Sequence, residues 1–399
     1  MNAERLYDLV LFGATGFTGG LTADYLAAHA PAQLRWALAG RNRGKLEQVR
    51  QRLAAIDARW AQLSLLTVDV EDQPAVRAMA ASTRIVATTV GPYARHGEAL
   101  VAACAQAGTD YLDLTGEPGF VDAMWLKYHA RAVESGARLV HSCGFDSIPH
   151  DLGAWFTVQQ LPSDEPLRIE GIVRVNGGFS AGTYHSAIEA FAHLRRDQRV
   201  AARRRAQDRA SDQREVHSLA ARIHHDRELG AWLVPLPTID AQVVRRSARA
   251  LDCYGPDFSY AHYVQIRKLS SVGILLGGVT GLLVAAQLPP TRWWLLARKR
   301  SGEGPDAGQR ARSRFSVRFR GRSLGPQARS VTCEVRGGDP GYTETAKMLA
   351  ESALCLAFDT LPACAGQVTT AQAMGAALVA RLQRAGITFE VLDGAGARP

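Results

Sequence analysis

The feature that most constrains the fold is a glycine-rich segment near the N-terminus, FGATGFTG at Phe12–Gly19. It follows an apolar run, Tyr7–Phe12, that predicts a strand, and it precedes a helical pattern. Glycine permits a sharp turn and a close approach to a pyrophosphate, whose charge the start of the helix stabilises. In this context the GxxGxxG spacing predicts a dinucleotide site. The predicted cofactor-binding residues in it are Gly13, Thr15, Gly16, Phe17, Thr18 and Gly19.

Short apolar runs alternate with helical patterns throughout residues 1–150. The predicted strands are Tyr7–Phe12, Leu34–Ala39, Leu63–Thr67, Arg84–Thr88, Tyr111–Leu114 and Arg138–His141. Helices are predicted to begin near Gly16, Arg43, Gln73, Gly97 and Phe120. This rhythm is typical of βαβ units with right-handed crossovers. It predicts an α/β fold in which residues 1–150 form a Rossmann domain with a doubly wound parallel sheet.

The end of the second predicted strand bears on which nicotinamide cofactor binds. NAD-binding domains place an acid about 20 residues after the glycines, at the ribose 2′-hydroxyl. Here no Asp or Glu occurs between Asp24 and Glu47, and the strand is followed by Arg41 and Asn42. Arg41 can form charge-assisted bonds with a 2′-phosphate, although a solvated helix start is the alternative. The pattern favours NADP, with Arg41 and Asn42 among the cofactor-binding residues.

Two more strand ends contribute candidate residues. Asp69 follows the third strand, where an adenine ring commonly lies in such folds, and Gly91 and Pro92 follow the fourth. Because ligands of doubly wound sheets lie beyond the carboxyl ends of strands, Gly91 and Pro92 predict a rigid turn beside the nicotinamide ribose. Tyr93 is either a wall of the pocket, which is the favoured interpretation, or a proton donor.

Titratable residues near the later strand ends are candidates for acid–base chemistry: Asp113, Glu117, Asp146, His150 and Asp151. Asp146 follows the sixth strand, and it either takes part in catalysis or caps the next helix. The Tyr-x-x-x-Lys pair of short-chain dehydrogenases is absent from the sequence. Tyr93 and Asp146 are therefore the candidate catalytic residues.

Cysteine and histidine usage argues against a metal site and against a disulfide framework. The six cysteines are scattered without a CxxC pair, and the eleven histidines include no HExxH motif. No secretory signal is recognisable at the N-terminus, so we expect a cytoplasmic protein with reduced thiols. No metal is predicted.

Residues 151–340 change pattern and predict an α+β domain built on an antiparallel sheet. Its predicted strands are Leu167–Val175, Ala231–Val234, Ala241–Arg245, Tyr260–Ile266, Arg314–Arg320 and Arg329–Val335, with a long helix over about 183–210. Residues 341–399 form a third segment, whose helices at 342–358 and 371–384 are predicted to pack back on the first domain.

An uncharged run of 23 residues, Leu269–Thr291, interrupts the second domain. Pro289 would end a helix there, which leaves about 30 Å of apolar helix, close to the thickness of a bilayer core. One interpretation is a buried core helix beside an acyl pocket, and the other is membrane contact. Trp293 and Trp294, followed by Arg298–Arg300, are typical of a membrane interface. We therefore expect peripheral association through 269–300 with the cytoplasmic face of the plasma membrane.

The net charge of +9 is concentrated in the same part of the chain. Residues 292–329 hold eleven basic and two acidic residues, while the remainder is close to neutral. Such a cluster fits either a solvated face or an anionic surface such as phospholipid head groups. A nucleic-acid partner is not expected.

Five ordered motifs resemble the saccharopine dehydrogenase-like oxidoreductases. They are GATGFTG (13–19), AGRNRGKL (39–46), TTVGPY (88–93), YLDLTGE (111–117) and GFDSIPHDLG (144–153). Within that family the chain resembles most the trans-acting enoyl reductases, which GYTETAKMLAESAL (341–354) also fits. The resemblance is dense over 1–155, thin over 156–330, and returns at 335–360. The family often carries Ser where this chain has His150, which puts any shared catalytic role for that position in doubt.

The resemblance implies a Rossmann domain, a second α+β domain and C-terminal helices that return to the first. It also implies NADPH-dependent reduction of a carbon–carbon double bond in a lipid-like or polyketide acyl substrate, within lipid or glycolipid biosynthesis. Two alternatives stay open: a soluble amino-acid reductase of saccharopine type, and a non-catalytic NADP-binding protein associated with lipid. A homo-oligomer is compatible with all three.

Overall fold

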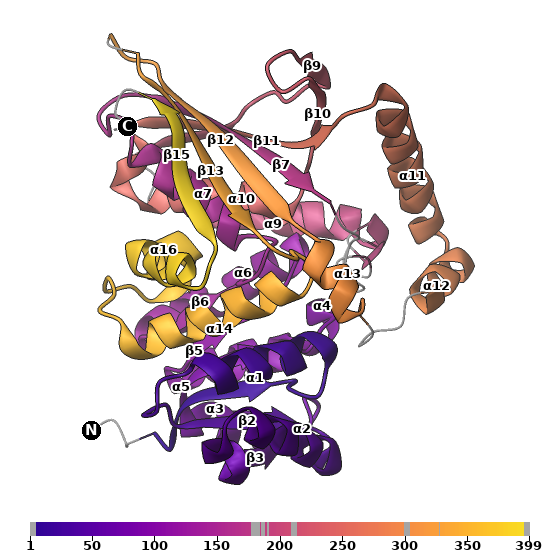
Figure 1. Cartoon of the computed structure of the whole chain (residues 1–399), viewed down its shortest axis with the longest axis vertical. Coiled ribbons are helices and arrows are strands. Elements are labelled where there is room, and N and C mark those ends of the chain that lie inside the picture. Colours follow the sequence, from indigo (N-terminus) through magenta and orange to yellow (C-terminus); the bar gives the residue numbers. More distant parts are fainter. Residues whose placement is uncertain are drawn as a thin grey trace.

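The computed structural model contains two β-sheets with helices between them (Figure 1). The first sheet lies toward one end of the long axis, and the second sheet lies toward the other. The structure describes residues 5–176, 184, 188–189, 191–208, 214–298, 304–326 and 328–394.

The first sheet has seven strands, all parallel, in the order β3-β2-β1-β4-β5-β6-β14. Its strands are β1 (Tyr7–Phe12), β2 (Trp36–Gly40), β3 (Ser64–Thr67), β4 (Thr83–Thr88), β5 (Asp110–Leu112), β6 (Arg138–Val140) and β14 (Gly366–Val368). The first six have the Rossmann order, which confirms the predicted doubly wound parallel sheet.

Helices cover both faces of this sheet. They are α1 (Phe17–His29), α2 (Arg43–Ile56), α3 (Gln73–Ser82), the short α4 (Tyr93–His96), α5 (Glu98–Ala107) and α6 (Pro118–Ser135), with the 3-10 turn η1 (Ala58–Gln62). Side chains alternate along a strand, so Leu9 and Leu11 belong to one core while Val10 and Phe12 belong to the other. Burial on both faces explains why the strands are almost continuously apolar.

The second sheet is mixed, so the prediction of an antiparallel sheet was wrong. Its strands are β7 (Leu167–Val175), β8 (Glu215–Ser218), β9 (His224–Asp226), β10 (Ala231–Pro235), β11 (Asp257–Ile266), β12 (Phe315–Ser323), β13 (Ser330–Gly337) and β15 (Thr388–Gly394). β11 runs parallel to both β7 and β8, and the other pairings are antiparallel. The long connection from β7 to β11 contains helices, and such a crossover permits parallel pairing.

The predicted strand Ala241–Arg245 was also wrong, because these residues lie in helix α10 (Ile239–Ala250). The buried side chains Ile239, Val243, Val244 and Ala248 recur at helical spacing, and tertiary packing overrides the strand propensity of the two valines. Helix α7 (Ile148–Val158) and α10 cover one face of the second sheet, with the 3-10 turn η3 (Asp252–Tyr254) after α10. The helix predicted over 183–210 is α9 (Leu194–Asp208) in the described part of the chain, and 177–183, 185–187, 190 and 209–213 lie outside it.

The open face of the second sheet carries part of the basic charge. Arg318 and Arg336 both pair with Glu334, and Arg320 pairs with Asp226. Arg318 and Arg320 are therefore compensated on a solvated face, which favours that interpretation for this part of 292–329.

The C-terminal segment contributes to both sheets. Helix α14 (Thr343–Phe358) packs against α1 and β4, as predicted, and α15 (Thr370–Ala373) and α16 (Gly375–Arg384) follow it. Between these helices β14 joins the first sheet beside β6, and β15 then joins the second beside β13. The division into 1–150, 151–340 and 341–399 stays a prediction.

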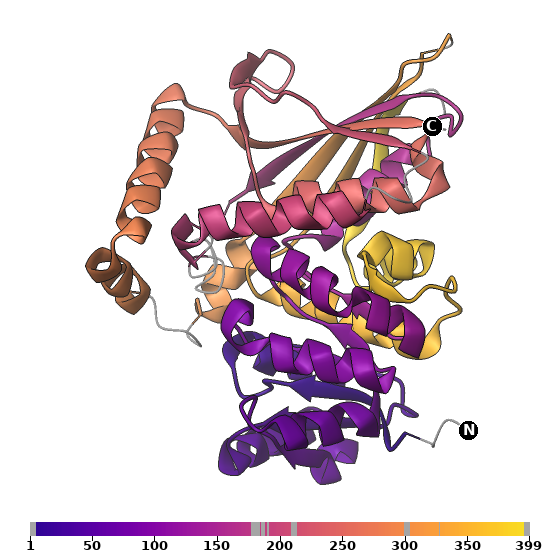
Figure 2. The same ribbon diagram turned by 180° about the vertical axis from the view of Figure 1, so that it is seen from behind.

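Helix α11 (Leu269–Gln287) projects from the body together with α12 (Pro289–Arg298), and both views show it standing apart (Figures 1 and 2). Of the described helices, it is the one long and apolar enough to cross a membrane, and only 11% of its apolar window is buried. The interpretation as a buried core helix was therefore wrong. Lys299 and Arg300 lie outside the described residues, and helix α13 (Ala307–Arg312) follows them.

Candidate cofactor and active site

The glycine loop connects β1 to α1 at the carboxyl edge of the first sheet. Gly13 has φ of +92°, a conformation that side chains disfavour, and Gly19 faces the loop so closely that a Cβ would lie 2.2 Å from the Gly13 carbonyl oxygen. Gly16, by contrast, is exposed, and a Cβ there would meet only that same oxygen, at 3.4 Å. Gly13 and Gly19 thus build the turn, and Gly16 leaves open space at the start of α1.

The remaining residues of the loop divide between surface and packing positions. Thr15 is exposed at the tip, and the carbonyl oxygen of Thr18 accepts a hydrogen bond from Thr22 within α1. The ring of Phe17 packs edge-on against Tyr342 at 4.9 Å, and the Arg310 guanidinium lies over it at 5.4 Å. Sequence reasoning missed this contact, because Arg310 on α13 is far from the loop in the chain.

Arg41 lies after β2 with its side chain exposed. No hydrogen bond or ion pair involves this side chain within the described ranges, although neighbouring Arg43 pairs with Glu47 and donates to the Leu65 carbonyl. Asn42 is the N-cap of α2, and its Oδ1 accepts a hydrogen bond from Lys45 N at 2.9 Å. Arg41 is therefore the available cation at this strand end, whereas the side-chain oxygen of Asn42 is already used by the helix.

The other predicted cofactor residues lie along the same edge. The exposed carboxylate of Asp69 accepts a hydrogen bond from Glu71 N at 3.1 Å, which orders the turn after β3. Gly91 is exposed and Pro92 half-buried, and the peptide bond between them is cis. The structure thus places Gly16, Arg41, Asp69 and Gly91 after four strands of one parallel sheet.

This edge fits a nicotinamide dinucleotide bearing a 2′-phosphate. Backbone N–H groups at the start of α1 are available for a pyrophosphate, and the space beside Gly16 permits its approach. Arg41 is exposed at the position where an arginine accommodates the 2′-phosphate in NADP-binding domains. The individual contacts to the cofactor stay predictions.

Tyr93 belongs to a buried hydrogen-bond network. Its hydroxyl donates to the Thr88 carbonyl at 3.2 Å and accepts from Leu114 N at 3.1 Å. Both oxygens of Glu117 accept from main-chain N–H groups, those of Tyr93 and Ala94. Burial raises the pKa of Tyr93 well above its usual range. This geometry favours the wall interpretation for Tyr93 and gives Glu117 a structural role.

Asp113 is fully buried and organises the strand ends of β5 and β6. Its carboxylate lies 2.6 Å from His141 Nδ1 and accepts hydrogen bonds from the main chain of Thr115 and Ser142. His141 also lines a cavity of about 240 Å³. Since β6 is separated from β1 by β5 and β4, this cavity is distinct from the glycine loop.

Asp151 and Asp146 have contrasting environments. The buried Asp151 carboxylate accepts hydrogen bonds from Ser247 on α10 and from Thr370 and Ala371 on α15, so it joins three helices. Asp146 is half-buried, with no hydrogen bond or ion pair in the described part of the chain. Burial, and then the charge of Asp240, raise the pKa of Asp146 to about 7. The helix-cap interpretation was wrong, because Ser147 is the N-cap of α7.

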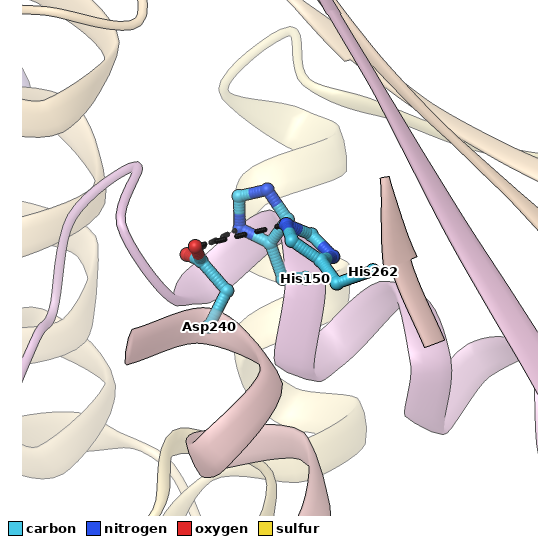
Figure 3. Close-up of side chains that lie close together, drawn as sticks. All are labelled: His150, Asp240 and His262. Atoms are coloured by element: carbon cyan, nitrogen blue, oxygen red, sulfur yellow. Dashed lines mark ion pairs between the residues drawn. The ribbon is translucent and has the colours of Figure 1, made fainter. Parts of the chain in front are cut away.

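His150 does not lie in the cofactor edge but in a buried cluster with Asp240 and His262 (Figure 3). These residues come from α7, α10 and β11. His150 Nδ1 lies 3.1 Å from Asp240 Oδ1, and His262 Nε2 lies 3.7 Å from Asp240 Oδ2. Burial lowers the pKa of both imidazoles to about 3, so both are neutral, and it raises that of Asp240 to about 6. Sequence reasoning missed Asp240 and His262.

A parallel sheet with a glycine loop at its carboxyl edge is the architecture of dinucleotide-binding oxidoreductases. A family model described as the saccharopine dehydrogenase NADP-binding domain matches residues 9–140. The chain is 36% identical over 415 residues to a putative trans-acting enoyl reductase of Mycobacterium tuberculosis, covering 97% of each protein. It is 35% identical over 418 residues to the trans-acting enoyl reductase of Mycobacterium bovis, covering 97% of this chain and 98% of that one. The chain belongs to the saccharopine dehydrogenase-like family, in the branch of the trans-acting enoyl reductases.

The fold has a solved counterpart at low sequence identity. Apo saccharopine dehydrogenase (L-Glu forming) from Saccharomyces cerevisiae superposes with a TM-score of 0.57 at 11% identity, covering 97% of this chain and all of that one. This likeness shows that the two-sheet architecture is shared.

Proposed function

We propose that the protein reduces the carbon–carbon double bond of an enoyl thioester on a lipid-like or polyketide chain, with NADPH as the reductant. The observation that carries this proposal is the open cofactor edge, with Gly16 and Arg41, in a chain whose full-length relatives bear the name enoyl reductase. A place in lipid or glycolipid biosynthesis is part of the proposal.

The chemistry requires a hydride at the β-carbon and a proton at the α-carbon, so that the double bond becomes a single bond. NADPH bound at this edge would supply the hydride and be released as NADP⁺. The glycine loop would hold the pyrophosphate and Arg41 would hold the 2′-phosphate, which would fix the position of the cofactor. Asp146 is the proposed proton donor, because its carboxyl group is partly accessible and has no partner in the described ranges. Tyr93, with its hydroxyl engaged on both sides, shapes the pocket wall.

NADPH consumption with defined substrates tests the proposal. We expect oxidation of NADPH with a trans-2-enoyl thioester of a long acyl chain, and no oxidation with 2-oxoglutarate and lysine. Asp146→Asn is expected to lower kcat at least about tenfold while the thermal midpoint holds, since a general acid contributes 10²–10⁴-fold. Asp164→Asn, at an exposed position that forms no ion pair in the described ranges, is the matched control. NADPH binding without turnover on any acyl thioester would favour the non-catalytic alternative instead.

Cofactor preference is expected to depend on Arg41. Arg41→Ala should weaken NADPH binding by about 1.5–3 kcal/mol, the contribution of a charged hydrogen bond, and should leave NADH binding nearly unchanged. Fluorescence titration of both cofactors measures this. Arg50→Ala, further along α2 and away from the strand end, controls for the loss of positive charge. Equal affinity of the unaltered protein for NADH and NADPH would contradict the assignment.

We also propose that α11 and α12 bring the protein to the cytoplasmic face of an anionic membrane, where a lipid-like substrate partitions. Apolar side chains are exposed on α11, with Ile274 76% exposed, and Trp293 on α12 is 75% exposed. Lys268 at one end of α11 and Arg292 after its other end provide positive charge at both ends, which fits a helix lying on the surface. Self-association through the same helices, giving a homo-oligomer, is the competing outcome.

Vesicle flotation should therefore show binding that falls only partly in high salt, because screening weakens the electrostatic contribution and leaves the apolar one. Replacing Ile274, Leu276, Val279 and Val284 by Ser should release the protein from vesicles and leave NADPH affinity intact, since all four are exposed. Ile56→Ser with Val133→Ser removes exposed apolar side chains elsewhere and is the control. Membrane docking would be refuted if the unaltered protein did not bind vesicles and if its oligomers dissociated in the fourfold variant.

A further inference from the structure

The cluster of His150, Asp240 and His262 has a composition that the proposed reduction does not use. All three side chains are more than nine-tenths buried, and their facing polar atoms are unsatisfied. His150 Nδ1, Asp240 Oδ1 and His262 Nε2 have no hydrogen-bond partner. Buried polar atoms are nearly always paired, and leaving one unpaired costs about 1–3 kcal/mol. Three such atoms lie within 4.8 Å of one another, close enough to share one ligand.

We propose that His150, Asp240 and His262 form a buried binding site for a divalent transition-metal ion, preferably zinc. The three side chains point toward one another from three separate elements (Figure 3), and their ligand atoms all lie within 4.8 Å of one another. Two imidazoles and one carboxylate are a donor set that zinc and other first-row metals accept.

The distances fit a tetrahedral ion. Ligand atoms about 2.0–2.1 Å from zinc at tetrahedral angles stand about 3.3 Å apart. His150 Nδ1 is 3.1 Å from Asp240 Oδ1 and His262 Nε2 is 3.7 Å from Asp240 Oδ2, so each nitrogen is close to that spacing from one carboxylate oxygen, and the three ligand atoms as a set lie within 4.8 Å of one another. An ion can therefore bind with small side-chain adjustments, and three protein ligands leave a fourth position for water.

The surroundings of the ligands also suit an ion. The Tyr260 hydroxyl lies 3.0 Å from His262 Nδ1 and directs the opposite nitrogen, Nε2, toward Asp240. The Thr238 hydroxyl donates to Asp240. Such outer contacts orient metal ligands in known sites. A cation between two imidazole nitrogens would also offset the charge of the buried Asp240 carboxylate.

An exposed group of similar composition provides a contrast. Glu215, His217 and Asp257 also approach one another, but His217 is 54% exposed and forms ion pairs with both acids. Because Glu215 and His217 are exposed and Asp257 is only half-buried, this group is a weaker candidate, and His217→Ala is a control for adventitious binding.

Metal content tests the inference independently of turnover. We expect protein produced with zinc and desalted to retain about one zinc per chain by mass spectrometry, and His217→Ala to retain the same amount. Asp240→Asn, which preserves shape, and His150→Ser should each retain less than about one-tenth of that. Zinc added to chelator-treated protein should raise the thermal midpoint of the unaltered chain and of His217→Ala, but not of Asp240→Asn.

Two results would overturn the site. The first is that the unaltered protein holds no stoichiometric metal and that added zinc does not change its thermal midpoint. In that case the three side chains would share a proton instead of an ion. The other is full zinc content in Asp240→Asn. If Asp240→Asn fails to fold, the zinc content and zinc-dependent midpoint of the unaltered protein still decide.

Discussion

Gly16→Val is expected to fold and to lose NADPH binding by about a hundredfold or more, which corresponds to about 2.7 kcal/mol. Gly16 is exposed at the N-cap of α1, with an extended φ of −80° and ψ of 169° that valine tolerates. A Cβ there meets only the Gly13 carbonyl oxygen, at 3.4 Å, so the fold has room for the added side chain. The pyrophosphate has no room beside a valine side chain, because it must approach the backbone at this point. Titration of NADPH fluorescence measures the loss.

Two other glycines of α1 separate folding from binding. Gly20→Ala meets the movable Arg52 guanidinium at 3.1 Å and should keep both the fold and the NADPH affinity. Gly19→Ala places Cβ 2.2 Å from the Gly13 carbonyl oxygen and 2.7 Å from Thr89 Oγ1, so this variant should be destabilised instead. A folded Gly16→Val protein with unaltered NADPH affinity would show that the cofactor binds elsewhere.

Asp151→Ala is expected to lower the free energy of unfolding by about 3–5 kcal/mol, because it leaves several buried donors without an acceptor at about 1–3 kcal/mol each. Asp151 is fully buried, and it accepts hydrogen bonds from Thr370 Oγ1 at 2.7 Å and Ala371 N at 2.9 Å, as well as from Ser247. Truncation would leave these donors unsatisfied between α7, α10 and α15. Urea denaturation followed by circular dichroism measures the change.

Asp151→Asn is the matched variant, because it can keep every one of these bonds. Its amide oxygen can accept from Thr370 and Ala371, while its NH₂ group donates to the Ser247 hydroxyl, which can donate to Thr369 Oγ1 at 2.6 Å. We expect it to lose much less stability than Asp151→Ala. If both variants were stable and both lost turnover, Asp151 would be catalytic rather than structural.

Much of the first sheet could be predicted because its information is local. Each strand from β1 to β6 is an apolar run bounded by polar residues, and β1 was predicted with its observed ends, Tyr7 and Phe12. The edge strand β14 could not be found this way. It has three residues, and only its position beside β6 makes it a strand.

In the second sheet, tertiary packing determined the secondary structure more strongly than local sequence patterns did. Val243 and Val244 favour strands as isolated residues, but α10 buries them against other elements. The parallel pairing of β11 with β7 depends on where a long connection returns the chain, which no local pattern encodes.

The residues of the candidate site also differ in whether local sequence or distant packing determines their roles. Gly13, Gly16 and Arg41 lie next to strand ends, so their roles could be inferred from neighbours in the chain. Whether an acid is free or bonded depends on distant partners, as Asp151 with Thr370 shows. Asp240 and His262 meet His150 only through the packing of α7, α10 and β11, and no short motif links them.

The two C-terminal strands have a consequence for how the protein is made. Synthesis runs from the N-terminus, so β6 leaves the ribosome long before β14, its neighbour in the sheet. Until then the nucleotide-binding half exposes an unpaired strand edge, which can recruit other chains. In the second sheet, β13 likewise lacks its neighbour β15 until the end of the chain has been synthesised. Neither half can therefore be completed as an independent unit during translation, and a nascent chain arrested before residue 366 would be a substrate for chaperones rather than a functional domain.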